Sequence, residues 1–353
     1  MSDAVLVTGA FGLVGSATVK HLAAAGRQVV ATDLDTPANR KAAAALPRGV
    51  TLRWTDLTDP KAVGALMSSV APASIIHLAA VIPPLCYVNP AVARKVNVEA
   101  TSTLVNAAAA EPKPPRFVQA SSIAVYGPRN PHRTTELLTA DTPVRPFDIY
   151  GGHKVEAEHL VRGSALDWVI LRLGGVIPTE LDASISQDML YLEGLPPTDG
   201  RLQTVDVRDV AHAFAAATTA DVIGQTLLIG GDDSHRQVQG EVAAAITGAM
   251  GLVGATAKGR KGNPDDDDAW FATDWMDSVK SQELLGFQHH SWPAILKETA
   301  DKTGWKRPLF RLVAPLAHEY LKRNSPYYKQ PGKYADPWGA VKRKWGRFEA
   351  DKA

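Results

Sequence analysis

The chain has 353 residues, a hydrophobic fraction of 45%, a charged fraction of 21% and a formal net charge of +1, which excludes a disordered or fibrous protein and favours one large bilobal globule. No apolar run approaches the roughly 20 residues that span a bilayer, and the first residues lack the features of a signal peptide, so we expect no membrane partner. A single cysteine, Cys86, excludes an internal disulfide framework and a zinc site built on paired cysteines, so we expect a cytoplasmic location and no metal.

Short β-branched segments alternate with alanine-rich segments over the first half of the chain. Helices are expected from Leu13, from Lys61, over Ala91–Ala110 and from Ile149. Strands are expected at Val5–Thr8, Gln28–Thr32, Thr51–Trp54, Ser74–Leu78, Phe117–Ser121 and Trp168–Leu173. These strands lack polar alternation, as is typical of strands buried on both faces of a parallel sheet. The pattern predicts an α/β fold with a Rossmann-type doubly wound parallel sheet.

The pattern changes after Gly174 and Gly175, where the elements become mixed. Further strands are expected at Thr204–Asp206 and Thr226–Ile229, and further helices at Val207–Thr218 and Val238–Met250. We expect three parts. Residues 1–175 form the Rossmann domain, with later elements interleaved, residues 176–307 form mainly a smaller α/β substrate-binding lobe, and residues 308–353 form a basic aromatic C-terminal arm. The acidic loop Gly262–Asp268 is expected to be solvated.

A glycine-rich turn joins the first strand to the first helix. Its sequence is Thr8-Gly9-Ala10-Phe11-Gly12-Leu13-Val14-Gly15. Gly9 permits a tight turn, Gly12 lets backbone N–H groups approach a pyrophosphate, and Gly15 allows the helix to pack closely on the strand. The helix N-terminus adds partial positive charge, so this turn predicts a dinucleotide site.

The residue after the second strand predicts which dinucleotide binds. Asp33 follows Gly15 by 18 positions, where a carboxylate can accept hydrogen bonds from the adenosine ribose hydroxyls. The same carboxylate would repel the additional phosphate of NADP. We therefore expect NAD as the cofactor.

A tyrosine and a lysine lie four positions apart at the start of a predicted helix. Tyr150 and Lys154 therefore share one helix face. A phenol is a poor base at neutral pH, and a nearby ammonium group is expected to lower the pKa of Tyr150. The pair predicts a general acid/base.

Seven separated motifs occur in an order that resembles the extended short-chain dehydrogenases/reductases, the NAD-dependent epimerase/dehydratase family. They are TGAxGxxG from Thr8, Asp33, Asp56-Leu57, His77-Leu78-Ala79-Ala80, Asn97-Val98, Ser121-Ser122-Ile123-Ala124-Val125-Tyr126-Gly127, and YxxxK at Tyr150. The resemblance covers roughly residues 4–230.

The resemblance implies a catalytic set and a cofactor set. Ser122 would hydrogen-bond the substrate oxygen, Tyr150 would be the acid/base, and Lys154 would hold the nicotinamide ribose and tune Tyr150. The expected cofactor residues are Gly9, Phe11, Gly12, Leu13, Gly15, Asp33, Asp56, Leu57, Leu78, Ala79, Ala80, Tyr150 and Lys154. Ser121 is an alternative catalytic serine, and Asn97 either supports the site or packs within its helix. His77 and His153 are expected to have packing or surface roles.

The family contains several chemistries, and one local departure bears on the choice. After Leu171-Arg172, nucleotide-sugar members often continue through an aromatic residue and an Asn, whereas this chain has Leu173-Gly174-Gly175-Val176. Ile123 and Ala124 also do not provide the acidic pair typical of the dehydratases. We therefore favour an NAD-dependent oxidoreductase that interconverts a secondary alcohol and a ketone. The alternatives are a nucleotide-sugar epimerase that regenerates its NAD and a non-catalytic NAD-binding scaffold.

Two expectations concern assembly. The helices Ala91–Ala110 and Ile149–Arg162 resemble the pair through which family members form dimers, which implies a homodimer. Residues 301–353 hold 13 Lys/Arg and 5 Asp/Glu, a charge of +8 against −7 for the remainder. We expect this aromatic, basic arm to dock on the acidic body near the substrate lobe and to help close the pocket, rather than to bind nucleic acid.

Overall fold

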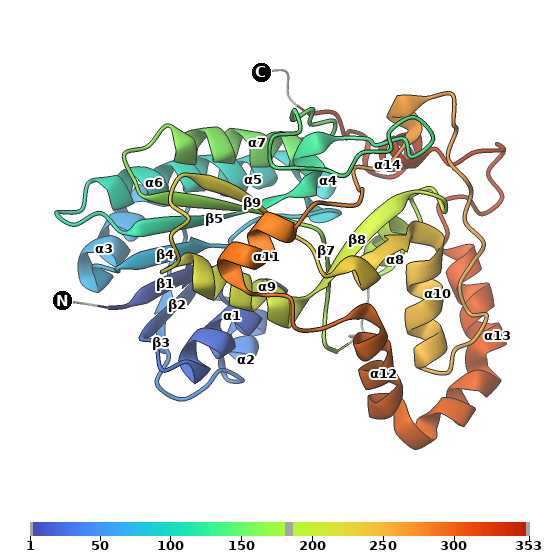
Figure 1. Cartoon of the computed structure of the whole chain (residues 1–353), viewed down its shortest axis with the longest axis horizontal. Coiled ribbons are helices and arrows are strands. Elements are labelled where there is room, and N and C mark those ends of the chain that lie inside the picture. Colours follow the sequence, from blue (N-terminus) through green and yellow to red (C-terminus); the bar gives the residue numbers. More distant parts are fainter. Residues whose placement is uncertain (1–2, 181–185, 351–353) are drawn as a thin grey trace.

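A seven-stranded parallel sheet forms the centre of the larger lobe (Figure 1), in a computed structural model that describes residues 3–180 and 186–350. The strand order is β3-β2-β1-β4-β5-β6-β9. Their bounds are β1 Val5–Thr8, β2 Val29–Asp33, β3 Thr51–Trp54, β4 Ser74–His77, β5 Arg116–Ser122, β6 Trp168–Leu173 and β9 Gln225–Ile229. The order reverses between β1 and β4, so the expected doubly wound Rossmann-type sheet is confirmed.

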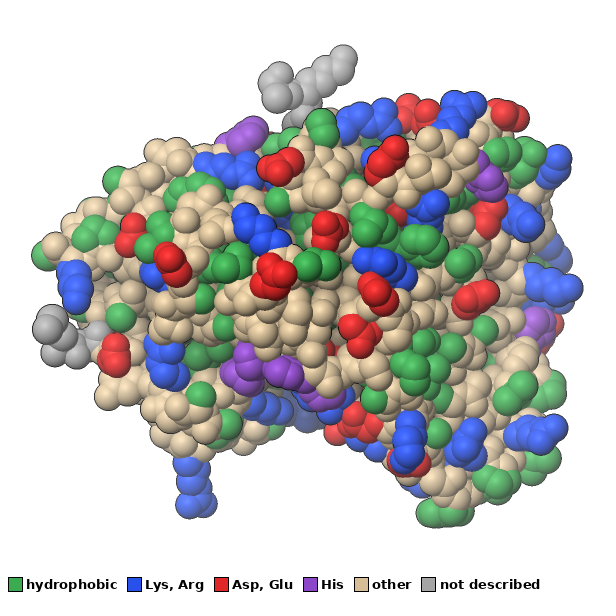
Figure 2. All heavy atoms as spheres, viewed as in Figure 1, with side chains coloured by type: hydrophobic (Ala, Val, Ile, Leu, Met, Phe, Trp, Pro, Cys, Tyr) green, Lys and Arg blue, Asp and Glu red, His purple; other side chains and the backbone are tan. Residues whose placement is uncertain are grey.

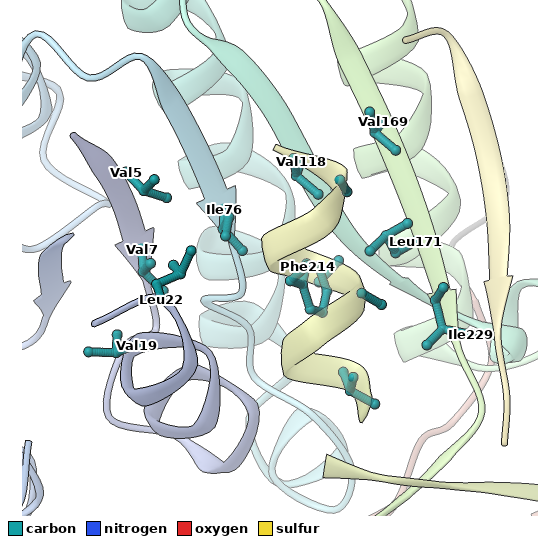
Figure 3. Close-up of a cluster of buried hydrophobic side chains, with 14 of the residues drawn as sticks. Val5, Val7, Val19, Leu22, Ile76, Val118, Val169, Leu171, Phe214 and Ile229 are labelled. Carbon is teal, nitrogen blue, oxygen red and sulfur yellow. The ribbon is translucent and has the colours of Figure 1, made fainter. Parts of the chain in front are cut away.

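Helices cover both faces of this sheet. Successive strand residues point to opposite sides, so the apolar strands present apolar side chains on both faces. Val5 and Val7 of β1 pack with α1 (Leu13–Ala24) and α9 (Val207–Ala217), and Figure 3 shows Val19, Leu22 and Phe214 of these helices against the strands. The intervening Leu6 points the other way, into a second cluster with α3 (Pro60–Val70) and α6 (Ala100–Ala109). Both faces are therefore buried, as the apolar strands predicted.

Side-chain caps stabilise the first turns of several helices, including α2 (Pro37–Ala43), which the sequence analysis did not predict. Asp59 accepts a hydrogen bond from the Lys61 backbone N–H at the start of α3, and Asp206 accepts one from Arg208 N–H at the start of α9. Thr36 caps α2 in the same way. Each cap satisfies a backbone donor that has no partner within its helix.

The expected single helix over residues 91–110 is three consecutive helical pieces. They are α5 (Pro90–Arg94), a π-helical turn (Lys95–Glu99) and α6. The extra residue in the π turn rotates the helix by part of a turn, which hydrophobic spacing alone does not reveal. A short helix, α4 (Leu85–Val88), precedes them.

A smaller three-stranded sheet and several helices form the second lobe. Strands β7 (Gly175–Ile177), β8 (Arg201–Asp206) and β10 (Arg236–Val238) lie in the order β10-β8-β7, with β7 parallel and β10 antiparallel to β8. The helices are α8 Gln187–Glu193, α10 Gln239–Ala249, α12 Trp292–Thr303 and α13 Arg307–Arg323, whereas α11 (Val279–Leu285) packs against β9 and α9 of the larger lobe. None of the helices in the described ranges is long and apolar enough to cross a bilayer.

The last helix, α14 (Pro337–Trp345), docks on the body of the protein, as expected for the arm. Trp338 is 5% exposed, and its indole N–H donates to the Trp270 carbonyl oxygen at 2.9 Å. The ring of Trp338 stacks on Phe271 with centroids 5.1 Å apart. Figure 1 shows α14 close to α4 and α7 (Ile149–Arg162).

Two aspartates of the acidic loop pair with arginine side chains. Asp267 lies 3.4 Å from Arg133, and Asp268 lies 2.9 Å from Arg145. Within residues 3–180 and 186–350, no group of three or more His, Cys, Asp or Glu side chains has an arrangement that could hold a metal ion.

Candidate active site

The glycine-rich turn lies at the carboxyl ends of β1 and β4, where the strand order reverses. Gly9 has φ of +63°, and a Cβ there would lie 2.7 Å from the Ala79 backbone nitrogen. A Cβ at Gly15 would overlap the Gly9 carbonyl oxygen. Neither position can hold a side chain without moving backbone, so these two glycines fix the turn against β4 and α1.

The N-terminus of α1 is available to an anion. Gly12 is its N-cap and offers no side-chain hydrogen bond, and the first turn contains no acidic residue. Leu13 is half exposed at the same end. The first N–H groups of this helix have no partner within it, and together with the helix dipole they suit a pyrophosphate.

Asp33 lies beside this turn at the end of β2. Its carboxylate accepts hydrogen bonds from the backbone N–H of Phe11 at 3.3 Å and of Leu34 at 2.8 Å. Burial raises the pKa of Asp33, and these backbone donors oppose that rise. The Trp54 ring packs on Phe11 with centroids 5.1 Å apart, so an aromatic residue that the sequence analysis did not select borders the same corner.

The other expected cofactor residues lie along the same sheet edge in two groups. Asp56 is exposed and accepts hydrogen bonds from the Thr58 N–H and hydroxyl, while the neighbouring Leu57 is buried in the core. Leu78 and Ala79 follow β4, and their N–H groups approach the Thr8 hydroxyl at 3.2 and 3.4 Å. Ala80 follows them directly, so this second group borders Gly9.

Ser122, Tyr150 and Lys154 come together at the carboxyl end of β5 and the start of α7. Ser122 ends β5, and Tyr150 hydrogen-bonds with its hydroxyl group. The Lys154 ammonium donates to the Ala120 carbonyl oxygen at 2.8 Å and lies 5.7 Å from the centre of the Tyr150 ring. The three residues that the family resemblance selected therefore form one cluster.

Burial dominates the protonation of this cluster. It raises the pKa of Tyr150 above its ordinary value, and Cys86 and Asp148 raise it further, while the hydrogen bond with Ser122 lowers it. The expectation that the ammonium would lower the Tyr150 pKa is therefore wrong for this structure. Burial also lowers the pKa of Lys154 to about 8.

Ser121, the alternative serine, points into a different network. Its hydroxyl donates to the Glu158 carboxylate at 2.6 Å, and Arg172 donates to both oxygens of that carboxylate, at 2.9 and 2.7 Å. All three side chains are buried. Because adjacent strand residues face opposite ways, only Ser122 is directed toward Tyr150.

The remaining polar candidates have structural contacts. The Asn97 amide accepts from the Val81 N–H at 2.7 Å and donates to the Val81 carbonyl oxygen at 2.9 Å, so it holds the chain that leaves β4. Its nitrogen lies 3.5 Å from a ring nitrogen of the buried His153. His77 contacts the hydroxyls of Thr8 and Thr101, and burial lowers its pKa to about 3. His77 is therefore a neutral packing residue.

The end of the arm contacts the start of α7, the helix that carries Tyr150 and Lys154. No local sequence pattern predicted this contact. The Ile149 N–H donates to the Phe348 carbonyl oxygen at 2.7 Å, and the Ala350 N–H donates to the Phe147 carbonyl oxygen at 3.3 Å. A Cβ at Gly152 would lie 3.1 Å from the Ala350 Cβ. The arm thus contacts the first turn of α7, which carries Tyr150.

The N-cap of α7 is held from the other side as well. Asp148 accepts a hydrogen bond from the Gly151 N–H at 3.0 Å and another from the Tyr87 hydroxyl at 2.6 Å. An Asp before a predicted helix was a local signal for the cap. Its tyrosine partner, 61 positions earlier, had no such signal.

Strand β8 packs closely on the two glycines after β6, most tightly at Gly174. A Cβ at Gly174 would lie 2.6 Å from the Gln203 carbonyl oxygen and 2.7 Å from the Met276 Cε, and a Cβ at Gly175 would lie 3.0 Å from the Leu202 Cδ1. Strand β8 thus packs directly on this segment. An amide side chain at Gly174 would require β8 to move.

Two surface hollows lie away from the cluster of Ser122, Tyr150 and Lys154. One of about 700 Å³ borders β9 and is lined by residues that include Thr139, Arg162 and Lys280, and another lies between α6 and α7. Neither contains Ser122, Tyr150 or Lys154. The geometry around Tyr150, rather than the size of a hollow, identifies the candidate active site.

Comparisons with known proteins identify the family and agree with the fold. A family model described as "NAD dependent epimerase/dehydratase family" matches residues 5–230. The chain is 28% identical over 268 residues to dTDP-glucose 4,6-dehydratase of Neisseria gonorrhoeae, covering 67% of this chain and 75% of that protein. It is 33% identical over 190 residues to UDP-glucose 4-epimerase 4 of Oryza sativa subsp. japonica, covering 49% and 48%. The fold resembles a solved complex of Thermus thermophilus UDP-glucose 4-epimerase with NAD, with a TM-score of 0.68 and 24% identity over 85% of this chain and 98% of that one.

Proposed function

Since this chain belongs to the NAD dependent epimerase/dehydratase family, we propose that it interconverts a secondary alcohol and a ketone with NAD and that Tyr150 moves the proton. Family membership confirms the expected kind of enzyme and NAD as its cofactor. The observation that carries the proposal is the cluster of Ser122, Tyr150 and Lys154 at the sheet edge that also bears the glycine turn.

The residues around the turn fit NAD. The uncapped N-terminus of α1 would receive the pyrophosphate, Asp33 would accept from the adenosine ribose hydroxyls, and Lys154 would hold the nicotinamide ribose. NAD, when bound, supplies the hydride acceptor or donor.

The chain's own residues handle the proton. In the oxidation, Tyr150 acts in its deprotonated form: the phenolate oxygen takes the proton of the substrate hydroxyl as the carbon that bears this hydroxyl loses hydride to NAD. Ser122 donates a hydrogen bond to the same substrate oxygen. In the reduction, the buried phenol returns the proton. Burial keeps Tyr150 protonated at neutral pH, so the resting site is prepared for the acid role.

The packing after β6 favours a substrate other than a nucleotide sugar. An amide that grips such a substrate is absent at both Gly174 and Gly175, and at Gly174 a side chain would meet the Gln203 carbonyl oxygen of β8. Ile123 and Ala124 also offer no carboxylate for a dehydration step, and Ile123 is buried in a hydrophobic cluster. We therefore propose net oxidation or reduction, with NADH as the second product or reactant.

A nucleotide-sugar epimerase is the second candidate, because both curated relatives act on nucleotide sugars by name and so does the solved neighbour. Such an enzyme would use the same Tyr150 chemistry twice and return its cofactor to NAD within one turnover. A scaffold that binds NAD without turnover is the weakest candidate, because its function would not require Ser122, Tyr150 and Lys154 to be assembled.

A substrate panel distinguishes these candidates. Purified protein with NAD is given sugars, sugar acids, sterols, aryl carbinols and UDP-glucose, and both NADH absorbance and product are measured. The proposal expects NADH in a one-to-one ratio with a ketone from a substrate that is not a nucleotide sugar. Epimer formation from UDP-glucose without net NADH would contradict it in favour of the epimerase, and NAD binding without turnover of any member would favour the scaffold.

A further inference from the structure

Helix α13 turns a row of large apolar side chains to solvent. Leu309, Leu312, Leu316 and Tyr320 follow one another at intervals of three or four residues, so they lie on one face of the helix. We call them the outer stripe. Leu312 is 77% exposed and Leu316 is 75% exposed, although side chains of this kind are usually covered.

The outer stripe is not the face that packs on the protein. Ala314 is the buried residue of α13, and Phe310 and Leu321, on the same side as Ala314, are partly buried. Trp305, one turn before the helix on the stripe side, is 77% exposed. The helix thus has two apolar faces, one of which is used by the fold.

Positive charge surrounds α13, mostly on the sides of the helix away from the outer stripe. Residues 302–323 contain six Lys or Arg and one acidic residue, Glu319. Glu319 is paired with Lys322 and Arg323. Lys306, Arg307 and Arg311 are exposed, and no acidic side chain of the described chain pairs with them. These cations therefore lie at the N-terminal half of α13, with Arg307 and Arg311 on the polar side of the helix away from the stripe.

The position of α13 matters as well. Figure 1 shows the helix at the outer edge of the smaller lobe, and Figure 2 shows hydrophobic side chains interspersed with Lys and Arg over that part of the surface. A convex helix at an edge can lie flat on a broad surface without a complementary groove.

We propose that α13 is a peripheral membrane-binding helix that lies on an anionic lipid surface. Its apolar stripe enters the interface between headgroups and acyl chains, and the charges of Lys306, Arg307 and Arg311 attract the anionic headgroups across the width of the helix. Trp305 and Tyr320 lie at the two ends of the stripe, and such residues favour the membrane interface. This departs from the expectation of no membrane partner, which rested on the lack of a spanning segment.

A second copy of the chain is a less suitable occupant of this face. Packing α13 on its own copy would bring together two segments that each carry six basic residues and one acidic residue. Like charges at that density oppose association. An anionic membrane supplies an apolar layer for the outer stripe and negative charge for the cations of α13.

Sedimentation with vesicles tests the proposal on the full chain. Vesicles of phosphatidylcholine with about one third phosphatidylglycerol are compared with vesicles of phosphatidylcholine alone. We expect binding to the mixed vesicles that weakens with added salt. The double variant Leu312→Asp/Leu316→Asp and the double variant Arg307→Glu/Arg311→Glu should each bind them at least about tenfold more weakly.

Matched controls separate the helix from general surface effects. Val279→Asp changes a comparably exposed apolar residue on α11, and Lys41→Glu/Lys61→Glu reverses two exposed cations on α2 and α3. Both controls should sediment like the unmodified chain. Because the tested side chains are exposed, all variants should keep their melting temperature, and the charge-reversal pair keeps the test decisive if the leucine variant does not fold.

Two outcomes overturn the proposal. One is equal sedimentation of the unmodified chain and both α13 variants. The other is a dimer mass by light scattering that falls to the monomer mass in Leu312→Asp/Leu316→Asp, without lipid and without any vesicle binding by the unmodified chain. That second outcome would assign the outer stripe to a copy of this chain.

Discussion

Replacing Trp338 by alanine should loosen the arm and, through it, the catalytic helix. The indole is 5% exposed and contacts three aromatic rings, those of Phe271, Phe348 and Phe147, with centroids 5.1, 5.4 and 5.4 Å away. It also donates to the Trp270 carbonyl oxygen. Truncation removes these contacts and leaves a cavity and a buried acceptor without its donor.

The structure sets the size of the effect. A buried aromatic residue replaced by alanine costs about 3–5 kcal/mol, and the lost hydrogen bond is part of that range. Phe348 stacks on Trp338, and its carbonyl oxygen accepts the Ile149 N–H in the residue before Tyr150. Turnover should therefore fall, whereas NAD binding, for which most of the expected residues lie on β1, α1, β2 and β4, should change by less than about twofold.

Denaturant unfolding, NAD titration and turnover of the same preparation test these expectations together. Trp305→Ala is the matched control for stability, because that indole is 77% exposed and should change the free energy of unfolding by less than about 0.5 kcal/mol. A loss below about 1 kcal/mol for Trp338→Ala would refute the docking argument. Equal losses of NAD binding and turnover would refute the link to α7.

Other perturbations probe separate parts of the site and assembly. NAD should bind at least about tenfold more tightly than NADP because of the Asp33 carboxylate, and titration showing equal affinity would contradict this role. The Lys154 ammonium is lost as pH rises through about 8, so the Kd for NAD should increase above that pH, and Lys154→Arg, which stays charged, should abolish the increase in a pH series. Deleting residues 324–353 should lower the melting temperature and weaken substrate turnover more than NAD binding, whereas an unchanged melting temperature and unchanged kinetics would show that the arm is not coupled to the site. A homodimer through α6 and α7 should give twice the chain mass in light scattering, and a monomer mass independent of concentration would exclude it.

The sequence predicted those helices and strands whose boundaries depend on residues close to them in the chain. The strand expected at Trp168–Leu173 has those bounds in the structure, and the helix expected from Ile149 begins there. A short, largely apolar run that is buried at its centre defines the first, and Asp148 caps the second. The π turn over Lys95–Glu99 was missed because one extra residue within a helix leaves the alanine-rich pattern unchanged.

Features that depend on distant residues could not be predicted in the same way. Strand alternation resolved the choice between Ser121 and Ser122 only after the Glu158 and Arg172 partners of Ser121 were located. The pKa of Tyr150 depends on how deeply three-dimensional packing buries it, which the spacing to Lys154 does not reveal. Docking of the arm was expected from its aromatic content and charge, but its contact with the catalytic helix required the fold.

The most direct test of the central claim measures the first turnover of Tyr150→Phe. The substrate is the first active alcohol of the panel, NAD is saturating, and NADH formation is followed in a stopped-flow instrument. We expect the variant to bind NAD normally and to form NADH at least about a hundredfold more slowly than the unmodified enzyme, because only the proton partner is lost. Tyr334→Phe, which removes a phenol from the arm, should retain the normal rate. A normal rate of NADH formation in Tyr150→Phe would contradict the assignment of Tyr150 as the acid/base.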